Sequence, residues 1–369
     1  MKICYLANAQ SVHTQKWVRF FADKGHEIYL ISFEKDHVEN VRMYNLKRPF
    51  GLRLGLDIPF RFVRAQAIKR LIERIDPDIL HAHYLVDYGL YGAFCGFKPF
   101  VVTAWGSDAL FIPSEGLRKY MVKRLISKYV ISKADLVTAD SESLLNAVII
   151  FGVPREKVKL IGHGVNLNVF HPSVGNEKLK EKLKIPVSCP VVISTRSLEP
   201  IYDVETLIKA IPIVLRSNDN VYFVIVGGGS SKTKLEMTAG ELGVSNRVRF
   251  VGRVSQMEVA ELLGMSDVYV STALSDSTPV SLLEAMACCL PVVITDLEAT
   301  REWIRDGVNG FFIRSMDFRA LADRILFLLE NRNVGRKFGS VSMRIVKEKA
   351  DYEKEMGKME QLYRKLAEV

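Results

Sequence analysis

Short apolar runs that alternate with helix-length segments are the feature that most limits how this chain can fold. In the first half the runs are KICYLA, EIYLIS, DILHAHY, PFVVTAW, ADLVTAD and VKLIGHG. Each is rich in aliphatic or aromatic residues and is followed by polar residues or glycine. Segments of helical length, such as 15–24, 62–75 and 115–132, lie between several of them. This alternation is typical of a parallel sheet covered by helices, so the sequence predicts an α/β, doubly wound domain.

The second half repeats the same pattern through PVVISTR, VYFVIVGGG, RVRFVGR, DVYVSTA, PVVITD and GFFIRS. We therefore predict two Rossmann-like domains, at 1–170 and 191–345, that face each other across a cleft. The segment 171–190, rich in proline and charge, is expected to link them. The last segment, 346–369, is predicted to form a helix that packs back on the first domain. Ligands of such sheets collect at the carboxyl ends of the strands.

Composition sets the class of protein. The chain has 369 residues, of which 48% are hydrophobic and 25% charged, which is typical of a globular protein. Its apolar runs are too short to cross a bilayer, and we expect no leader peptide. Five cysteines, an odd number without metal-ligand spacing, favour a reducing, cytoplasmic setting. The formal net charge of +9 favours an anionic partner.

The stretch SDSTPVSLLEAM predicts a polar turn that leads into a helix. Pro279 suits the first helical turn, where its missing N–H costs nothing. The N–H groups of Val280 and Ser281 would then bind an anion at the helix N-terminus, beside Ser277 and Thr278. The competing interpretation is that one of these two hydroxyl residues simply caps the helix.

Two carboxylates accompany this turn. Glu284, about one turn into the helix, suits a ribose, whose adjacent hydroxyls can both donate to a carboxylate. Asp276, on the loop, is placed to reach a sugar bound beyond the phosphates. The alternative is that both acids are solvated.

Two further strand ends carry candidate phosphate-binding residues. The run FVIVGGGSSK places Gly228 and Gly229 where a backbone can approach a phosphate, with Lys232 nearby. A plain tight turn would explain the same glycines. Arg196 follows the run VVIST and could clamp a diphosphate, although an arginine after a strand is often a surface residue. Arg253, at the end of RVRFVGR, completes the expected nucleotide-binding set.

Nearly the whole chain resembles glycosyltransferase family 4, whose members have the GT-B fold. The most specific matches are ADLVTADSESLLNAVIIFGVPREKVKLIGHGVNLNVFHP and DSTPVSLLEAMACCLPVVITDLEATREWIRDGVNGFF. The closing DYEKEMGKMEQLYRKL is similar to the family's final helix. The resemblance implies an enzyme of class EC 2.4, of the hexosyltransferase type, that moves a sugar from a nucleoside diphosphate sugar with retention of configuration.

The resemblance also implies residue roles. Glu284 would bind the donor ribose, Asp276 would lie at the reacting sugar, and Arg196 would bind the diphosphate. The lysine that usually follows the arginine is missing, and Tyr202 and Asp203 lie near its position. Many members also have histidine where this chain has a tryptophan, in VVTAWGSD.

The first domain is expected to hold the acceptor. Candidates follow the first strand and several later ones: Asn8, Gln10, Ser11, His13, His83, Trp105, Ser107, Asp108 and His163. Capping of a helix by Ser11 is the competing role for that residue, and a structural role competes for each histidine.

The expected donor is a UDP-sugar, with GDP as the second nucleotide, and no metal or other cofactor. The net charge and the basic, amphipathic segment Glu115–Ile131 favour a glycan or lipid-linked acceptor and a peripheral place on the inner face of an anionic membrane. An ordinary helix packed on the sheet would show the same pattern. Nucleic acid is not an expected partner, because no known binding module is present. Two alternatives stay open: a sugar-nucleotide epimerase of this fold, and a non-catalytic subunit that binds nucleotide sugars.

Overall fold

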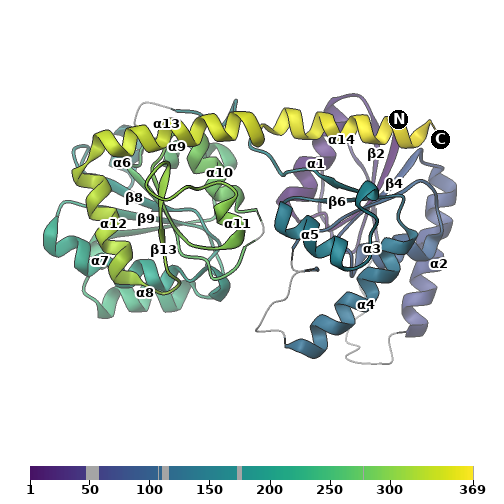
Figure 1. The fold of residues 1–369 in the computed structure, drawn as a ribbon, viewed down its shortest axis with the longest axis horizontal. Helices are drawn as coiled ribbons and strands as arrows, with labels where there is room; N and C mark the ends of the chain where they lie inside the picture. Colours follow the sequence, from purple (N-terminus) through teal and green to yellow (C-terminus); the bar gives the residue numbers. More distant parts are fainter. Residues whose placement is uncertain (47–57, 107, 110–115, 173–176, 277, 369) are drawn as a thin grey trace. The chain divides into compact units, whose positions relative to one another are not determined.

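The computed structural model describes residues 1–46, 58–106, 108–109, 116–172, 177–276 and 278–368, and the chain forms two compact units. Unit 1 comprises Met1–His163 with Lys354–Val369, and unit 2 comprises Gly164–Glu353. Each is a parallel sheet with helices on both faces, as Figure 1 shows, which confirms the α/β, doubly wound prediction. The segment 171–190, expected as a linker, lies inside unit 2: it carries α6 (Glu177–Lys182), and its Ile185 and Cys189 are buried in that unit's core.

The sheet of unit 1 has the strand order β3-β2-β1-β4-β5-β6-β7, and its paired neighbours run parallel. The strands are β1 (Lys2–Leu6), β2 (Glu27–Ser32), β3 (Arg42–Asn45), β4 (Ile79–His83), β5 (Phe100–Thr103), β6 (Leu136–Ala139) and β7 (Val158–Leu160). All six predicted runs form strands. The edge strand β3 was not predicted, because its sequence RMYN has no apolar alternation.

Helices cover unit 1 on both faces of the sheet. They are α1 (Val12–Asp23), α2 (Ile58–Ile75), α3 (Tyr88–Cys95), α4 (Leu117–Lys133), α5 (Glu142–Ile150) and α14 (Tyr352–Ala367), with a short 3-10 turn, η2 (Arg155–Lys157). Side chains alternate along the strands: Cys4 and Leu6 of β1 join the core beneath α2, α3, α4 and α5. Tyr5, on the opposite face, hydrogen-bonds through its hydroxyl to Tyr363 of α14, at 3.1 Å.

The sheet of unit 2 has the order β10-β9-β8-β11-β12-β13, again with parallel pairs. Its strands are β8 (Val191–Ser194), β9 (Tyr222–Val226), β10 (Val248–Gly252), β11 (Val268–Ser271), β12 (Val292–Thr295) and β13 (Gly310–Ile313). The further elements are α7 (Val204–Ser217), α8 (Lys232–Glu241), α9 (Gln256–Gly264), α10 (Val280–Ala287), α11 (Glu298–Arg301), α12 (Phe318–Glu330), α13 (Arg332–Lys349), η3 (Pro200–Tyr202) and η4 (Ser245–Arg247). All six predicted strands of this half are present.

Helix α13 was not predicted from the sequence. Its segment, RNVGRKFGSVSMRIVKEK, carries two glycines, which disfavour a helix. In the fold Gly339 lies against the backbone of Cys289, and a Cβ at this position would collide with the Cys289 carbonyl. The glycine therefore allows close helix packing that local propensity does not reveal. No helix of the described part of the chain is long and apolar enough to traverse a lipid bilayer.

Candidate functional site

The carboxyl ends of three adjacent strands of unit 2 bring the predicted phosphate-binding residues together. Arg196 follows β8, the glycine turn follows β9, and the loop with Asp276 follows β11 and leads into α10. Because β8 lies between β9 and β11 in the sheet, Arg196 occupies the middle of this edge. The edge is where ligands of doubly wound sheets bind.

Arg196 is a buried residue rather than a surface one, with 7% of its area exposed. Its Nη2 donates to Asp276 Oδ2 at 2.5 Å, and its Nη1 donates to Ser281 Oγ at 2.9 Å. The ring of Tyr202 lies against the guanidinium, with 4.2 Å between Cζ and the ring centroid. The surface-residue interpretation is therefore wrong, and Arg196, Asp276 and Ser281 form one centre.

The electrostatics of this centre keep Arg196 charged and leave hydrogen-bonding capacity at its Nε. Burial is the largest single influence and opposes the charge, but the Asp276 carboxylate together with Tyr269 and Tyr202 outweighs it, so the pKa of Arg196 is raised. Its Nε–H is buried and has no hydrogen-bond partner among the described residues. A buried donor without a partner is unfavourable, by about 1–3 kcal/mol. An anion bound beside the guanidinium would satisfy it.

The start of α10 joins the same centre. Pro279, which was predicted in the first helical turn, is the N-cap residue of α10. Ser281 Oγ accepts from Arg196 and also from the hydroxyl of Tyr269, at 2.9 Å. Glu284 lies three residues after Ser281 on α10 and is half-buried. Ser277 lies outside the described residues.

The glycine turn after β9 supports the fold of the site. Gly227 has φ +138°, and a Cβ there would come within 2.5 Å of the Arg196 carbonyl oxygen. A Cβ at Gly229 would collide with the Leu198 backbone, and one at Gly228 would meet the side chain of Arg253 at 3.1 Å. These contacts match the tight-turn interpretation of Gly228 and Gly229. Lys232 pairs with Glu236 across one helical turn, 3.7 Å apart, where both side chains are exposed.

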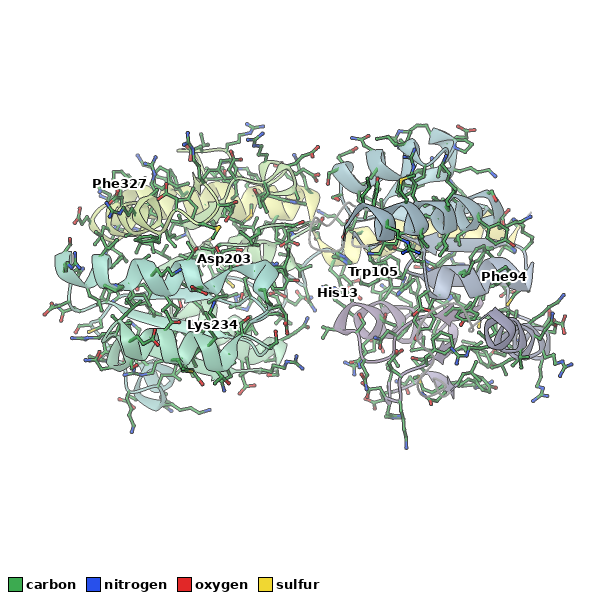
Figure 2. All side chains as sticks on the ribbon, turned by 90° about the horizontal axis from the view of Figure 1, so that it is seen from below. His13, Phe94, Trp105, Asp203, Lys234 and Phe327 are labelled. Carbon is green, nitrogen blue, oxygen red and sulfur yellow. The ribbon has the colours of Figure 1, made fainter. Side chains whose placement is uncertain are left out.

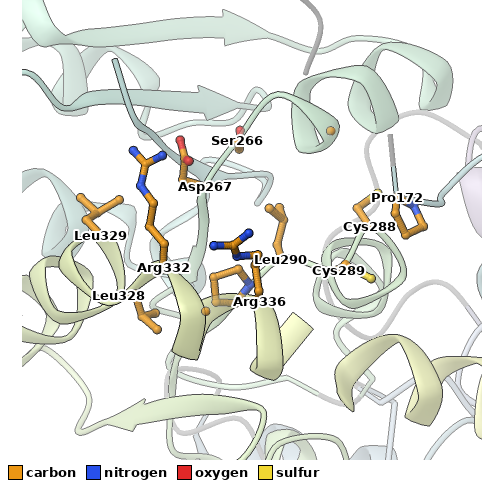
Figure 3. A pocket seen from close by; sticks show the side chains of 13 residues that line it. Pro172, Ser266, Asp267, Cys288, Cys289, Leu290, Leu328, Leu329, Arg332 and Arg336 are labelled. Atoms are coloured by element: carbon orange, nitrogen blue, oxygen red, sulfur yellow. The ribbon is translucent and has the colours of Figure 1, made fainter. Parts of the chain in front are cut away.

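A cavity of about 570 Å³ in unit 2 lies away from this centre (Figure 3). Asp267 and Pro291, which line it, directly precede β11 and β12, so the cavity lies at the amino ends of these strands. Arg332 and Arg336 of α13 also line it. Its size alone does not make it the donor site, because Arg196 and Asp276 lie at the opposite end of the sheet.

Three histidines of unit 1 form a second, aromatic cluster with Trp105. The ring centroid of His13 lies 5.2 Å from that of Trp105, and both residues are labelled in Figure 2. It lies 4.5 Å from the ring centroid of His163. His83 lies 5.0 Å from Trp105. His163 Nε2 contacts Asp140 Oδ2 at 2.9 Å. Three histidines that are far apart in the sequence thus meet around Trp105.

A cavity of about 250 Å³ adjoins this cluster. Its lining residues are Asn8, Ser11, Thr14, His83, Tyr84, Asp87, Tyr88 and Trp105. His83 Nε2 and Trp105 Nε1 are buried and have no hydrogen-bond partner in the described parts of the chain. Burial, with a smaller contribution from His163, lowers the pKa of His83 to about 3, so this ring is neutral. Burial likewise lowers the pKa of His13 well below its usual range.

Several predicted acceptor residues also have structural roles. Ser11 is the N-cap of α1, and its Oγ accepts from the N–H of Thr14 at 3.4 Å. Asn8 Oδ1 accepts from the N–H of Gln10, at 2.8 Å. Asp108 is 1% exposed and accepts from the N–H groups of Leu85 and Trp105, at 2.7 and 3.0 Å. The Asp108 carboxylate therefore holds the loop that carries Trp105, which argues against its predicted contact with a sugar.

The geometry adds Tyr202, Tyr269 and Asp140 to the residues proposed from the sequence. Tyr202 was noticed only as a departure from the family pattern, and Tyr269 lies inside a strand, where its apolar neighbours hide it. Asp140 ends a predicted strand beside a serine, so the sequence offered a signal for it. Within the described ranges, no group of three or more histidine, cysteine, aspartate or glutamate residues could hold a metal ion. Ser107, like Ser277, lies outside those ranges.

Comparison with known protein families gives two matches. The model described as "Glycosyl transferases group 1" matches residues 175–342, and that described as "Glycosyl transferase 4-like" matches residues 2–141. The first match contains Arg196 and Asp276, and the second contains His13, His83 and Trp105. Together they cover the greater part of both units.

Individual relatives show the same likeness. N-acetyl-alpha-D-glucosaminyl L-malate synthase of Bacillus anthracis is 25% identical over 365 residues, which is 93% of this chain and 90% of that protein. Phosphatidyl-myo-inositol mannosyltransferase of Mycobacterium leprae is 37% identical over 134 residues, 36% of this chain and 35% of that protein. The crystal structure of Anabaena Alr3699/HepE in complex with UDP-glucose matches with a TM-score of 0.81 at 20% identity, over 99% of this chain and all of that one (100%). Both chains have the GT-B fold.

Proposed function

Because the chain belongs to the group 1, family 4-like glycosyltransferases of GT-B fold, we propose that it transfers a sugar from a UDP-sugar to a glycan or lipid-linked acceptor, with retention of anomeric configuration. The observation that carries the donor assignment is the buried Arg196 centre. A permanently charged guanidinium with a buried, unused N–H suits a diphosphate, because its planar fork can donate several bonds to phosphate oxygens.

In this mechanism unit 2 stabilises the leaving group. Negative charge develops on the diphosphate as the bond to the anomeric carbon breaks, while the sugar gains oxocarbenium character. Arg196 and the N–H groups of Val280 and Ser281 would stabilise that charge, and they stand ready in the folded site. Glu284 would accept hydrogen bonds from the ribose hydroxyls. Asp276, half-buried on the loop before α10, would face the reacting sugar.

The nucleotide is the first part of the proposal to test. HepE from Anabaena, which shares the fold, was solved with UDP-glucose, and this supports UDP ahead of GDP. Calorimetric titration of UDP, GDP and ADP into the metal-free protein should show selective micromolar binding of UDP. Selective binding of GDP would replace the proposed nucleotide. Absence of binding by all three would contradict the donor site.

The stereochemistry needs its own experiment. A panel of UDP-sugars incubated with candidate acceptors should give a product whose anomeric proton, followed by NMR, shows the donor's configuration from the first turnover. An inverted product would contradict the retaining assignment. Release of an epimerised sugar nucleotide without any acceptor would favour the epimerase alternative.

We place the acceptor at the cavity beside Trp105 in unit 1. Two residues on its wall have buried nitrogens without a hydrogen-bond partner in the described residues: Trp105 Nε1 and His83 Nε2. A hydroxyl group between them could accept a hydrogen bond from the indole N–H and form a second one with the imidazole nitrogen. His83 is fixed from its other side, where Nδ1 lies 3.3 Å from Thr14 Oγ1. A neutral imidazole and an indole N–H suit the hydroxyl groups of a sugar ring.

A membrane-bound acceptor is supported by the surface of α4. Five apolar side chains on this helix are exposed, and they follow a spacing of about one turn: Leu117 (66%), Met121 (44%), Val122 (51%), Leu125 (66%) and Tyr129 (38%). Phe94 of α3, labelled in Figure 2, is 48% exposed. Its ring centroid lies 5.6 Å from that of Tyr129, so it extends this apolar stripe. Ile126, predicted on the same face, packs on the core instead. Glu115, the first residue of the predicted segment, lies outside the described residues.

Charge complementarity makes an anionic bilayer the proposed occupant of the α4 stripe. Arg118, Lys123, Arg124 and Lys128 share the helix with it. Each basic residue near an anionic surface contributes about 1 kcal/mol. Leu125→Glu should abolish cosedimentation with phosphatidylglycerol vesicles, whereas Met257→Glu, at a similarly exposed site of unit 2, should not. Equal binding of both variants would exclude this surface.

A further inference from the structure

Tyr202 occupies a special place in the donor centre, although it is neither charged nor polar enough to bind a phosphate strongly. It ends η3, the turn that follows Arg196 along the chain, and its ring is half-buried against the guanidinium, 4.2 Å from Cζ. A cation on an aromatic face is attracted by the ring's quadrupole, more so when water is excluded. Tyr202 thus contacts the guanidinium through the face of its ring, and no hydrogen bond joins the two side chains in the described part of the chain.

The turn that carries Tyr202 is tied to the loop that carries Asp276. The N–H of Leu274 donates to the Ile201 carbonyl at 2.8 Å, and Thr272 Oγ1 donates to the Asp203 carbonyl at 2.8 Å. Asp203 has a left-handed backbone, with φ 43°, and its carboxylate accepts from Thr206 Oγ1 at 2.7 Å. The ring is therefore held on a turn that is fixed from both sides.

Arg196 needs such a support because its polar contacts compete with the ligand. The bond to Asp276 joins the proposed phosphate-binding cation to a carboxylate, and a diphosphate beside the guanidinium would draw on the same N–H groups. The ring contact uses no N–H and persists when the donor binds. We propose that Tyr202 is a positioning residue that fixes the plane of the Arg196 guanidinium and so directs its N–H edge toward the donor diphosphate. This inference rests on the proposed donor function.

This role also bears on the sequence around Tyr202, which lies near the position of the lysine that this chain lacks. A lysine there would add a second positive charge. The tyrosine adds none, and it orients the cation that is present. The contribution of Arg196 to diphosphate binding accordingly depends on the orientation of its planar guanidinium.

The test compares Tyr202→Phe with Tyr202→Leu in calorimetric titrations of UDP. Phenylalanine keeps the aromatic face, so its dissociation constant should stay within about twofold of the wild type. Leucine fills similar space without the face, so UDP binding should weaken about tenfold, and kcat/KM for the donor should fall with it. Equal affinity of the leucine variant and the wild type would overturn the inference.

Two controls separate positioning from folding. Tyr222→Leu removes the ring beneath Arg247 and Arg249 in the same unit, so it should leave UDP affinity unchanged. In an Arg196→Lys background, where no plane remains to be oriented, Tyr202→Leu should alter the dissociation constant by less than threefold. A tenfold loss there would also overturn the proposal. Failure of the wild type to bind UDP would refute the donor function itself.

Discussion

The two candidate sites differ in how they keep polar groups in a protein interior. In unit 2 a buried cation is balanced by a carboxylate and supported by an aromatic ring, around Arg196. In unit 1 burial lowers the pKa of His83 to about 3, and the cluster around Trp105 offers N–H and lone-pair groups instead of charge. A charged site suits a diphosphate and a neutral one suits hydroxyls. This difference in chemistry is the basis for proposing the donor site in unit 2 and the acceptor site in unit 1.

The largest effect is expected when the positive charge of Arg196 is removed from unit 2. Arg196→Met should lower transfer by at least about 100-fold, because preorganised donors at a developing anion are worth about 10²–10³ in rate. UDP affinity should fall as well, as measured by calorimetry. Arg247→Met, which removes another guanidinium that lies on an aromatic ring, serves as the control. Unchanged transfer in the Arg196 variant would leave the charged centre without a function.

Removal of the Asp276 carboxylate should affect sugar transfer and UDP binding differently. Asp276→Asn keeps the shape of the side chain but releases Arg196 from an ion pair with 2.5 Å between donor and acceptor. Transfer should fall about 100-fold, since the carboxylate near the reacting sugar is lost. UDP should bind as tightly as before or a few-fold tighter, because a negative charge beside the diphosphate is gone. A large loss of UDP affinity would show that Asp276 binds the nucleotide.

A fall in pH should lower the stability of unit 1, because several of its buried histidines have lowered pKa values. Burial lowers the pKa values of His13, His81 and His83, so their stabilising effect is complete above pH 6.5 and is lost as pH falls below it. Burial raises the pKa of Asp108 to about 6, and this acts in the opposite direction. The three histidines outweigh Asp108, so the net loss in the free energy of unfolding from pH 7 to pH 5 should be about 4 kcal/mol.

Tryptophan fluorescence can measure this loss in unit 1. Of the three tryptophans, Trp17 and Trp105 lie in unit 1 and Trp303 in unit 2. In a Trp303→Phe background, urea unfolding followed by fluorescence reports on unit 1. Stability that is equal at the two pH values would contradict the assignment of neutral, buried histidines.

The smallest expected effect concerns the cavity beside Trp105. Trp105→Phe removes one buried N–H and keeps the aromatic bulk. It should lower kcat/KM for the acceptor about tenfold, since a lost hydrogen bond in a buried site costs roughly 1–2 kcal/mol. UDP affinity should not change. A variant that loses UDP binding instead would place Trp105 at the donor.

Much of the fold follows from local pattern. Buried parallel strands need continuous apolar runs, and every predicted run became a strand. The elements that escaped prediction are those whose sequence opposes their structure. The edge strand β3 is polar, and α13 contains Gly335 and Gly339, which serve packing against Pro291 and Cys289. Such features depend on neighbours that are distant in the sequence.

The sequence predicts those site residues whose positions follow directly from the ends of strands. Arg196 and Asp276 each follow a strand of the same sheet, and adjacent carboxyl ends bring them together. The contact of Tyr202 with Arg196 depends on a short turn whose direction no periodicity reveals. The glycine turn was ambiguous because glycine serves both a ligand and a close backbone approach. Only the contacts at Gly227 and Gly229 favour the second role.

A crystal structure of the protein with UDP would test directly whether the donor binds at the Arg196 centre. We expect the diphosphate within hydrogen-bonding distance of Arg196 and of the N–H groups at the start of α10, with the ribose at Glu284 and the Tyr202 ring still beneath the guanidinium. UDP bound elsewhere, for example in the cavity lined by Arg332 and Arg336, would contradict it.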